Sequence, residues 1–207
     1  MKWKTKEVWL KEHPNSLDKM TAIATELKCM IEPMVKRCEV AGSIRRGKPI
    51  CNDIDLVVLM DSEDFEPVVE MLKGFNMKVS EPTYTKSRKI LNLDFEYEGK
   101  KGQIFITFYR KYFGGLFMHR TGSRDFNVFM ATKAMKKGLK FSMYGLHDRK
   151  TSRFIVGRER QIFEVMGMLF VYPKNRNIGW LKHMGWWASE YEYQDLQQIG
   201  TLPTKHD

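Results

Sequence analysis

The alternation of apolar and polar residues predicts helices and strands along most of the chain. Helices are expected at residues 16–36, 64–75, 121–138 and 158–169, and strands at 38–43, 53–60 and in a hairpin at 90–109. The first helix places apolar side chains at helical spacing behind a serine, and Pro33 ends or kinks it. The hairpin strands alternate around a turn at residues 98–102. This order of elements predicts an α+β fold.

Paired glycines in KYFGGLFMHR, residues 111–120, follow the last predicted hairpin strand and precede a predicted helix. Glycine pairs between periodic segments are typical of a connection rather than of an element. We therefore expect two domains, one over residues 1–118 with an N-terminal helical segment and one over residues 119–207.

Two aspartates, Asp53 and Asp55, interrupt the apolar strand DIDLVV at residues 53–58. Residues two apart in a strand point to one face, with their Cα atoms about 7 Å apart. Ionised carboxylates are costly to bury unless another charge compensates them. Two explanations stay open here, a bound cation or a buried arginine. A third, a pair of solvated surface carboxylates, would need neither.

The segment GSIRRGK, residues 42–48, precedes these carboxylates and can bind phosphate. Gly42 and Ser43 offer backbone N–H and hydroxyl groups, and the positive charge of Arg46 and its neighbours lies beside them. Magnesium commonly shares one or two carboxylates with substrate phosphates. Two such ions can clamp the attacking and leaving oxygens of a nucleotidyl transfer. The combination favours catalysis over a solvated surface strand.

Composition adds a preference for polyanions. The 207 residues contain 35 Lys and Arg against 25 Asp and Glu, a formal net charge of +10. This charge suits a nucleic acid or an acidic surface, although a basic surface with no ligand is the alternative. The three cysteines match no zinc or CxxC spacing and are expected to be free thiols. The N-terminal residues contain no apolar run long enough for a signal peptide or membrane span, so we expect a soluble, intracellular protein. We also expect it to be a monomer.

Several motifs resemble the DNA polymerase X family, the group that contains DNA polymerase beta. GSIRRGK followed by DIDLVV is similar to its nucleotidyltransferase signature, and HRTGSRDFNVFMATKAMKKGLKFSMYGL to its nucleotide-contacting stretch. GRERQIFEVMGMLFVYPKNR resembles its closing helix and proline-containing tail. The likeness covers roughly residues 17–177. It implies a palm domain, a mixed sheet with helices on one face, followed by a small C-terminal nucleotide-binding lobe.

The resemblance also implies an enzyme, a magnesium-dependent (or manganese-dependent) DNA polymerase of the gap-filling repair type. Its partners would be primer-template or gapped DNA and nucleoside triphosphates. Asp53 and Asp55 would hold two metal ions, and Ser43 and Arg46 would contact the β and γ phosphates, beside Gly42. Gly122 would lie against the nucleotide sugar and Asn127 would reach the minor-groove edge of the base.

One departure from the family pattern concerns its third metal-binding aspartate. The matching stretch is GQIFIT, and the position holds Gln103. An amide oxygen can bind magnesium, but it carries no charge and cannot accept the proton of an attacking hydroxyl, assistance worth roughly 10²–10⁴ in rate. In the predicted hairpin Glu96 is expected opposite Gln103, as a candidate substitute, with Asp94 two residues further back.

Other departures affect the nucleotide and DNA contacts. His119 and Arg120 replace an aromatic pair that helps to exclude a 2′-hydroxyl, and Ala131 replaces an arginine that contacts the template strand. The chain begins where the family's fingers begin, so a minimal form without the N-terminal lyase domain is expected. Five tail residues could stack on bases or, the preferred alternative, pack on the palm; they are Trp180, Trp186, Trp187, Tyr191 and Tyr193.

Three functions follow from this pattern. The first is DNA-directed nucleotide addition to a 3′-hydroxyl, slowed by Gln103. The second is template-independent or ribonucleotide addition, which His119, Arg120 and Ala131 favour. The third is a catalytically weakened module that binds nucleotide and DNA.

Overall fold

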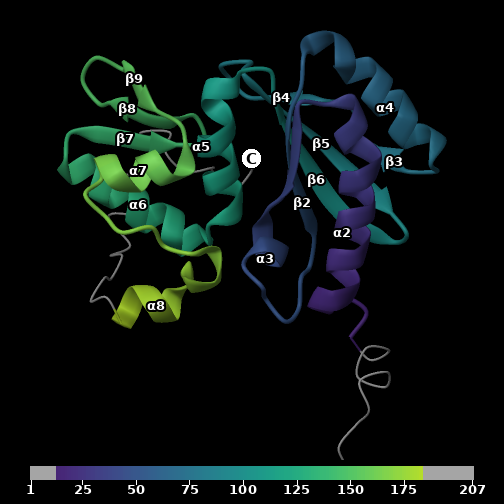
Figure 1. Ribbon diagram of the computed structural model, residues 1–207, viewed down its shortest axis with the longest axis horizontal. Coiled ribbons are helices and arrows are strands. Elements are labelled where there is room, and N and C mark those ends of the chain that lie inside the picture. The colour runs from purple at the N-terminus through teal and green to yellow at the C-terminus, as the bar shows by residue number, and fades with distance from the viewer. Residues whose placement is uncertain (1–12, 184–207) are drawn as a thin grey trace, which may run out of the picture. The chain divides into compact units, whose positions relative to one another are not determined.

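The computed structural model describes residues 13–183, which form two compact units. The division falls between Phe108 and Tyr109, ahead of the expected boundary after residue 118. Figure 1 shows the elements of both units.

The N-terminal unit is a mixed sheet with helices. Its elements are α2 (Leu17–Ile31), the 3₁₀ turn η1 (Glu32–Met34), β1 (Arg37–Val40), α3 (Gly42–Arg45), β2 (Ile54–Leu59), η2 (Ser62–Asp64), α4 (Phe65–Gly74), β3 (Lys78–Val79), β4 (Thr83–Tyr84), β5 (Ile90–Tyr97) and β6 (Lys100–Thr107). The sheet order is β1-β2-β6-β5-β3, with β4 also paired to β5. Strands β2 and β6 are parallel and the other pairs are antiparallel, which confirms the predicted mixed sheet.

Helices α2 and α4 cover one face of this sheet (Figure 1). Apolar residues of α2, such as Leu27 and Ile31, form a single buried cluster with Leu72 of α4 and with Leu56 and Val58 of β2. Because side chains alternate along a strand, Asp55 lies on the opposite face of the sheet. The aspartate therefore lies on the face that α2 and α4 do not cover.

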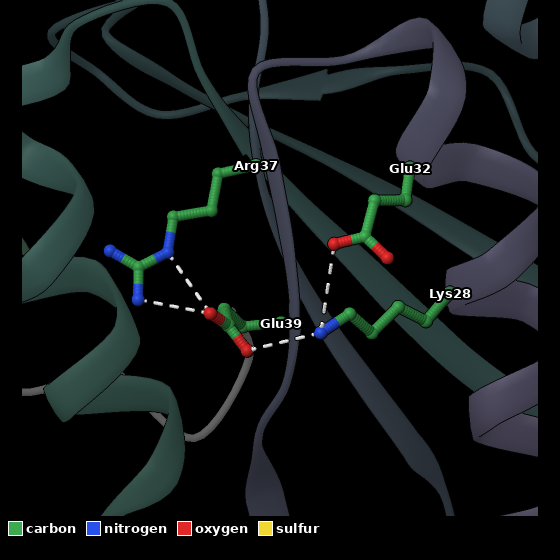
Figure 2. Close-up of polar contacts among 4 residues, drawn as sticks. All are labelled: Lys28, Glu32, Arg37 and Glu39. Atoms are coloured by element: carbon green, nitrogen blue, oxygen red, sulfur yellow. Dashed lines mark hydrogen bonds and ion pairs between the residues drawn. The ribbon is translucent and has the colours of Figure 1, made fainter.

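A charged network links helix α2 to the edge strand β1, as Figure 2 shows. Lys28 on α2 lies 3.9 Å from Glu32 and 3.5 Å from Glu39, and Glu39 lies 2.9 Å from Arg37. Arg37 and Glu39 are exposed or partly buried on β1, so the network covers an edge strand with charge. Charged side chains at such an edge oppose pairing with another chain.

The C-terminal unit packs helices around a small antiparallel sheet. Its elements are α5 (Arg110–Thr121), α6 (Arg124–Lys136), β7 (Leu139–Ser142), β8 (Gly145–Asp148), β9 (Phe154–Val156), α7 (Glu159–Val165), η3 (Pro173–Asn175) and α8 (Ile178–His183). The strands pair in the order β7-β8-β9. A separate buried cluster joins residues of α5, α6, β7, β8 and α7.

The glycine pair predicted to mark a connection instead lies inside helix α5. A Cβ at Gly114 would lie 2.4 Å from the carbonyl oxygen of Gly157, and one at Gly115 would lie 2.4 Å from the backbone nitrogen of Gly145. Both approaches are within the same unit, and only residues without a side chain permit them. The glycines serve close packing of the helix rather than a break in the chain, so the predicted connection is wrong.

A buried arginine ties the proline-containing tail to this unit. Arg176 is completely buried, donates from Nε to the carbonyl oxygen of Val171 at 2.9 Å, and lies 2.8 Å from the carboxylate of Glu159 on α7. Its guanidinium also lies 5.3 Å from the ring centre of Phe126 and 5.4 Å from that of Phe163.

The preferred packing of the aromatic tail on the palm is wrong for Trp180. Its ring centre lies 6.4 Å from that of Phe126 and 6.3 Å from that of Phe129, both on α6. Trp180 thus packs on the C-terminal unit. The other tail aromatics fall outside the described residues.

Candidate functional site

The Gly-Ser turn and the second aspartate of DID meet in the structure. Gly42 has a φ of 57°, and a Cβ at this position would lie 1.9 Å from Oδ2 of Asp55. The backbone N–H of Ala41 donates to the carbonyl oxygen of Asp55 at 2.8 Å, which fixes the turn against β2. The carboxylate therefore occupies the space that any side chain at Gly42 would need.

Asp53 lies one residue before β2, in a bend rather than in the predicted strand, and it is exposed. The loop that carries it is held to the start of α2. Cys51 N–H donates to the carbonyl oxygen of Asn15 at 2.9 Å, and Leu17 N–H donates to that of Pro49 at 2.9 Å. Asp53 is thus an exposed carboxylate on an anchored segment.

Arg46 supplies positive charge to both aspartates. Burial lowers the pKa of its guanidinium, whereas Asp55 most strongly, then Cys51 and Asp53, raise it. Arginine stays protonated in proteins, so these directions report proximity rather than a change of charge. A partly buried arginine therefore lies near the two aspartates, which was one of the two explanations for carboxylates in an apolar strand. It leaves room for a cation, because one guanidinium cannot neutralise two carboxylates.

Ser43 also has the character expected of a ligand-binding group. Its Oγ atom is buried and has no hydrogen-bond partner among the described residues. Buried polar atoms in proteins are nearly always paired with protein, water or a ligand. The hydroxyl is therefore available to an oxygen of a bound phosphate beside Gly42.

Gln103 lies directly beside Asp55 in the sheet. The parallel pairing of β2 with β6 sets Asp55 opposite Gln103, and the antiparallel pairing of β6 with β5 sets Gln103 opposite Asp94. Three polar side chains thus form a row across neighbouring strands, on the face away from α2 and α4. Gln103 donates from Nε2 to Oδ1 of Asp94 at 2.7 Å.

The expected pairing of Glu96 with Gln103 is wrong. Glu96 pairs with Lys101 and lies 3.4 Å from Lys78. The prediction assumed a longer turn, whereas only Glu98 and Gly99 connect the strands, with φ values of 49° and 67°. Positive φ at both central residues is typical of a tight type I′ turn, which shifts the register by two residues. The residue opposite Gln103 is therefore Asp94, which the predicted register places two residues away. The Glu98-Gly99 pair, typical of a tight turn, was the sequence signal that could have given the correct register.

The donor set of this row suits a hard divalent cation. Asp53 and Asp55 provide carboxylate oxygens and Gln103 an amide oxygen, the atoms that magnesium binds. Within residues 13–183 no group of three or more His, Cys, Asp and Glu side chains is placed to hold a metal ion. By residue type alone, Asp53, Asp55 and Gln103 fit two carboxylate ligands and a neutral one.

The candidate nucleotide-binding residues of the C-terminal unit form a second group, at the junction of α5 and α6. Ser123 caps α6 by accepting from the N–H of Phe126 at 3.2 Å. Asn127 is buried and donates from Nδ2 to the carbonyl oxygen of His119 at 2.7 Å. A Cβ at Gly122 would lie 2.6 Å from Oδ1 of Asn127. Part of the Thr-Gly-Ser…Asn pattern is therefore explained by the joining of two helices.

His119 and Arg120 lie in the last turn of α5. His119 is 5 % exposed, and its ring nitrogens have no hydrogen-bond partner among the described residues. Burial, and secondarily the charge of Arg120, lowers the pKa of His119 to about 3. The imidazole is thus neutral at physiological pH, while Arg120 is partly buried beside it.

Comparisons with known proteins agree with this arrangement. The DNA polymerase beta thumb family model matches residues 116–177. The DNA polymerase/3'-5' exonuclease PolX of Bacillus subtilis is 29% identical over 161 residues, which are 77% of this chain and 27% of that protein. The Repair DNA polymerase X of African swine fever virus (isolate Pig/Kenya/KEN-50/1950) is 22% identical over 71% of this chain and 85% of the viral protein.

A solved structure, the Leishmania infantum polymerase beta ternary P/T complex, has a TM-score of 0.61 and 20% sequence identity over 78% of this chain and 76% of that one. Its likeness shows a mixed α/β fold similar to that of polymerase beta. The fold and the sequence matches both relate this chain to DNA polymerases. The chain is similar in sequence to proteins named polymerase X and similar in fold to polymerase beta. It spans only about a quarter of the Bacillus protein, 27% of its length. Within the described residues no helix is long and apolar enough to cross a membrane.

Proposed function

We propose that this chain transfers nucleotides to the 3′-hydroxyl of DNA in a reaction that depends on a divalent metal. One observation carries the proposal. The Asp55 carboxylate lies against Gly42, in the turn whose Ser43 hydroxyl is buried without a partner among the described residues. Carboxylates beside an available phosphate-binding turn suit a nucleoside triphosphate with its metal ions.

Asp53 and Asp55 would hold the metal, Mg²⁺ or Mn²⁺, with the amide oxygen of Gln103 as a neutral ligand. When bound, a pair of such ions supplies charge stabilisation to the attacking and leaving oxygens of the transfer. Ser43 would donate a hydrogen bond to a phosphate oxygen, and Arg46 would add a charge-assisted contact. Arg46 lies close enough to Asp55 and Asp53 for both carboxylates to raise the pKa of its guanidinium.

The C-terminal unit would bind the nucleoside. Gly122 permits close backbone approach to a ligand, and Asn127 retains an N–H that His119 does not use, which could donate to the acceptors that base pairs share in the minor groove. Arg120 could donate to a sugar hydroxyl or a phosphate, whereas His119 is buried and neutral and would shape the site without charge.

DNA is the proposed macromolecular partner. The net charge of +10 suits a polyanion, and relatives are named as DNA polymerases, one of them as a repair enzyme. Two similar solved structures of Leishmania infantum polymerase beta are a ternary P/T complex and a ternary gap complex. We therefore expect gapped or primer-template duplexes to bind better than single strands.

The alternative of a weakened binding module is favoured by one feature, the amide at residue 103. Gln103 cannot accept a proton from the 3′-hydroxyl, and its Nε2 atom is occupied by Asp94. We expect turnover to be slow for this reason, while nucleotide and DNA still bind.

A primer-extension assay tests these functions together. The full chain is incubated with Mg²⁺ and labelled primer, alone, in a primer-template and in a one-nucleotide gap, with dNTP or rNTP. Extension of the gapped and templated substrates with dNTP supports the proposal, provided that Asp53→Asn and Asp55→Asn abolish it. Extension of the lone primer, or preference for rNTP, supports the second enzyme activity. Binding of gapped DNA without any extension, at high enzyme concentration and with Mn²⁺, supports the binding module.

A further inference from the structure

The polar row Asp55, Gln103 and Asp94 has one member that the metal chemistry does not require. Asp94 lies two strands from Asp55, and neighbouring strands are about 4.8 Å apart. A carboxylate at that distance cannot readily share a ligand ion with Asp55. Its contact in the structure is with the Gln103 amide instead, at 2.7 Å.

That hydrogen bond determines which atom of the amide faces Asp94. An ionised carboxylate only accepts hydrogen bonds, so the nitrogen of Gln103 must point toward it. The amide oxygen, bonded to the same carbon as this nitrogen, is then turned away from Asp94. The oxygen is thus available to a cation.

Without Asp94 a competing arrangement becomes favourable. The Gln103 amide could rotate and donate from its nitrogen to the carboxylate of Asp55, its neighbour in the parallel pair. A donor would then occupy the Asp55 oxygen and face the place where positive charge has to bind. The carboxylate at residue 94 opposes this rotation by holding the amide nitrogen.

Asp94 is itself held in place. Its backbone N–H donates to Oγ of Ser80 at 3.0 Å, and its carbonyl oxygen accepts from the N–H of Ser80 at 2.9 Å. These contacts hold the backbone of β5 at residue 94, from which the carboxylate accepts the hydrogen bond of Gln103.

We propose that Asp94 is a positioning residue, which orients the Gln103 amide so that its oxygen faces the metal site at Asp55. This inference rests on the proposed function, because it assigns a role toward the same metal. It also explains how a neutral residue at position 103 can serve there. The Asp94 carboxylate lies on β5, and the Gln103 amide on β6 lies between it and Asp55 on β2.

The test measures Mn²⁺ binding to the full chain by electron paramagnetic resonance, without any turnover. Asp94→Ala should weaken Mn²⁺ binding by roughly tenfold or more, the usual cost of removing a partner that orients a metal ligand. Glu96→Ala is the matched control, because this acid lies on the same strand and face but pairs with Lys101. It should bind Mn²⁺ like the unchanged protein. Thermal unfolding of both variants shows whether either substitution destabilises the sheet.

A rescue variant separates orientation from sheet stability. In Gln103→Glu/Asp94→Asn the side chain at 103 has two acceptor oxygens, so it needs no partner to orient it. Mn²⁺ binding should return to that of the unchanged protein or exceed it. Gln103→Glu alone should gain less, because like charges directly opposite one another in a sheet repel.

Different failures are distinguishable. If Asp53→Asn abolishes Mn²⁺ binding while Asp94→Ala does not change it, the positioning role is overturned and the proposed function stands. Equal losses in Asp94→Ala and Glu96→Ala, or no rescue by the double variant, also overturn it. If Mn²⁺ binding is absent, or unaffected by Asp53→Asn, the metal site fails and the inference fails with it.

Discussion

At the scale of single residues, the buried side chain of His119 makes the stability of the protein depend on pH. Its pKa is lowered from 6.5 to about 3 by burial, so the folded protein keeps it neutral where the unfolded chain binds a proton. The stability contributed by a neutral His119 is therefore fully present above pH 6.5 and is lost as the pH falls toward 3.

We predict that His119→Phe removes part of the acid sensitivity. Between pH 7 and pH 5 the histidine should cost the unchanged protein about 2 kcal/mol in free energy of unfolding. Urea unfolding of both proteins at the two pH values measures this. The variant should lose correspondingly less stability over that interval, since phenylalanine does not titrate. Equal losses would mean that His119 is protonated, or reaches solvent, in the folded state.

Individual residues also show what sequence reasoning can and cannot provide. Gly42 and Asp55 could be assigned to one site from their spacing and their chemistry, whereas the direct contact between them is a finding of the structure. Asp94 could not be placed in the same way. Its contact with Gln103 depends on a register that two residues of turn determine, Glu98 and Gly99. An error of two positions there exchanges Asp94 for Glu96.

At the scale of elements, the Gly42 turn offers a test with an internal control. Gly42 and Gly47 both have positive φ, 57° and 68°, but a Cβ at Gly42 would lie 1.9 Å from Asp55 whereas one at Gly47 would meet nothing within 4 Å. Gly47→Ala should cost about 1–2 kcal/mol, the price of left-handed backbone alone.

Gly42→Ala should cost more than Gly47→Ala, because Asp55 must also move, and it alone should abolish nucleotide addition. Chemical unfolding and the primer-extension assay together check this. If both alanine variants retain activity, the contact between Gly42 and Asp55 does not position the carboxylate.

The contact between Glu159 and the buried Arg176 links helix α7 to the proline-containing tail. Removing one partner of a buried ion pair leaves an uncompensated charge, at a cost of about 3–5 kcal/mol. Glu159→Ala should therefore lower the stability of the C-terminal unit by an amount near the lower end, since Glu159 keeps 13 % exposure. Calorimetry measures it. The double variant Glu159→Ala/Arg176→Met should regain part of the loss, and a further loss would contradict the ion pair.

Elements were predictable where local pattern and tertiary packing agree. The helix at Leu17–Ile31 followed from periodicity, because the same apolar face that defines it is the face buried on the sheet. Helix α5 did not, because Gly114 and Gly115 are poor helix formers and their purpose lies in residues far along the chain, Gly157 and Gly145. Helix propensity describes only the local free-energy cost of a glycine in a helix. The close contacts with Gly157 and Gly145 that offset this cost involve residues distant in the sequence.

At the scale of the whole molecule, the predicted mixed sheet is present. The boundary between the two units lies at another position than the one expected after residue 118. The division follows Phe108 and precedes α5, the helix that was not predicted because it contains Gly114 and Gly115. Charge remains the property of the whole chain that points to its partner. A net +10 is spread over many lysines and arginines, so no single substitution tests it.

Binding of gapped duplex DNA should therefore weaken steeply as salt rises. Each phosphate contacted by Lys or Arg releases condensed counterions, which gives a slope of about −0.9 per contact in a plot of log K against log salt. Fluorescence anisotropy of a labelled gapped duplex at several NaCl concentrations measures that slope. Binding of a lone nucleoside triphosphate is the control, and its slope should be smaller because few charges are involved. A flat plot for the gapped duplex would show that the +10 charge does not serve nucleic-acid binding.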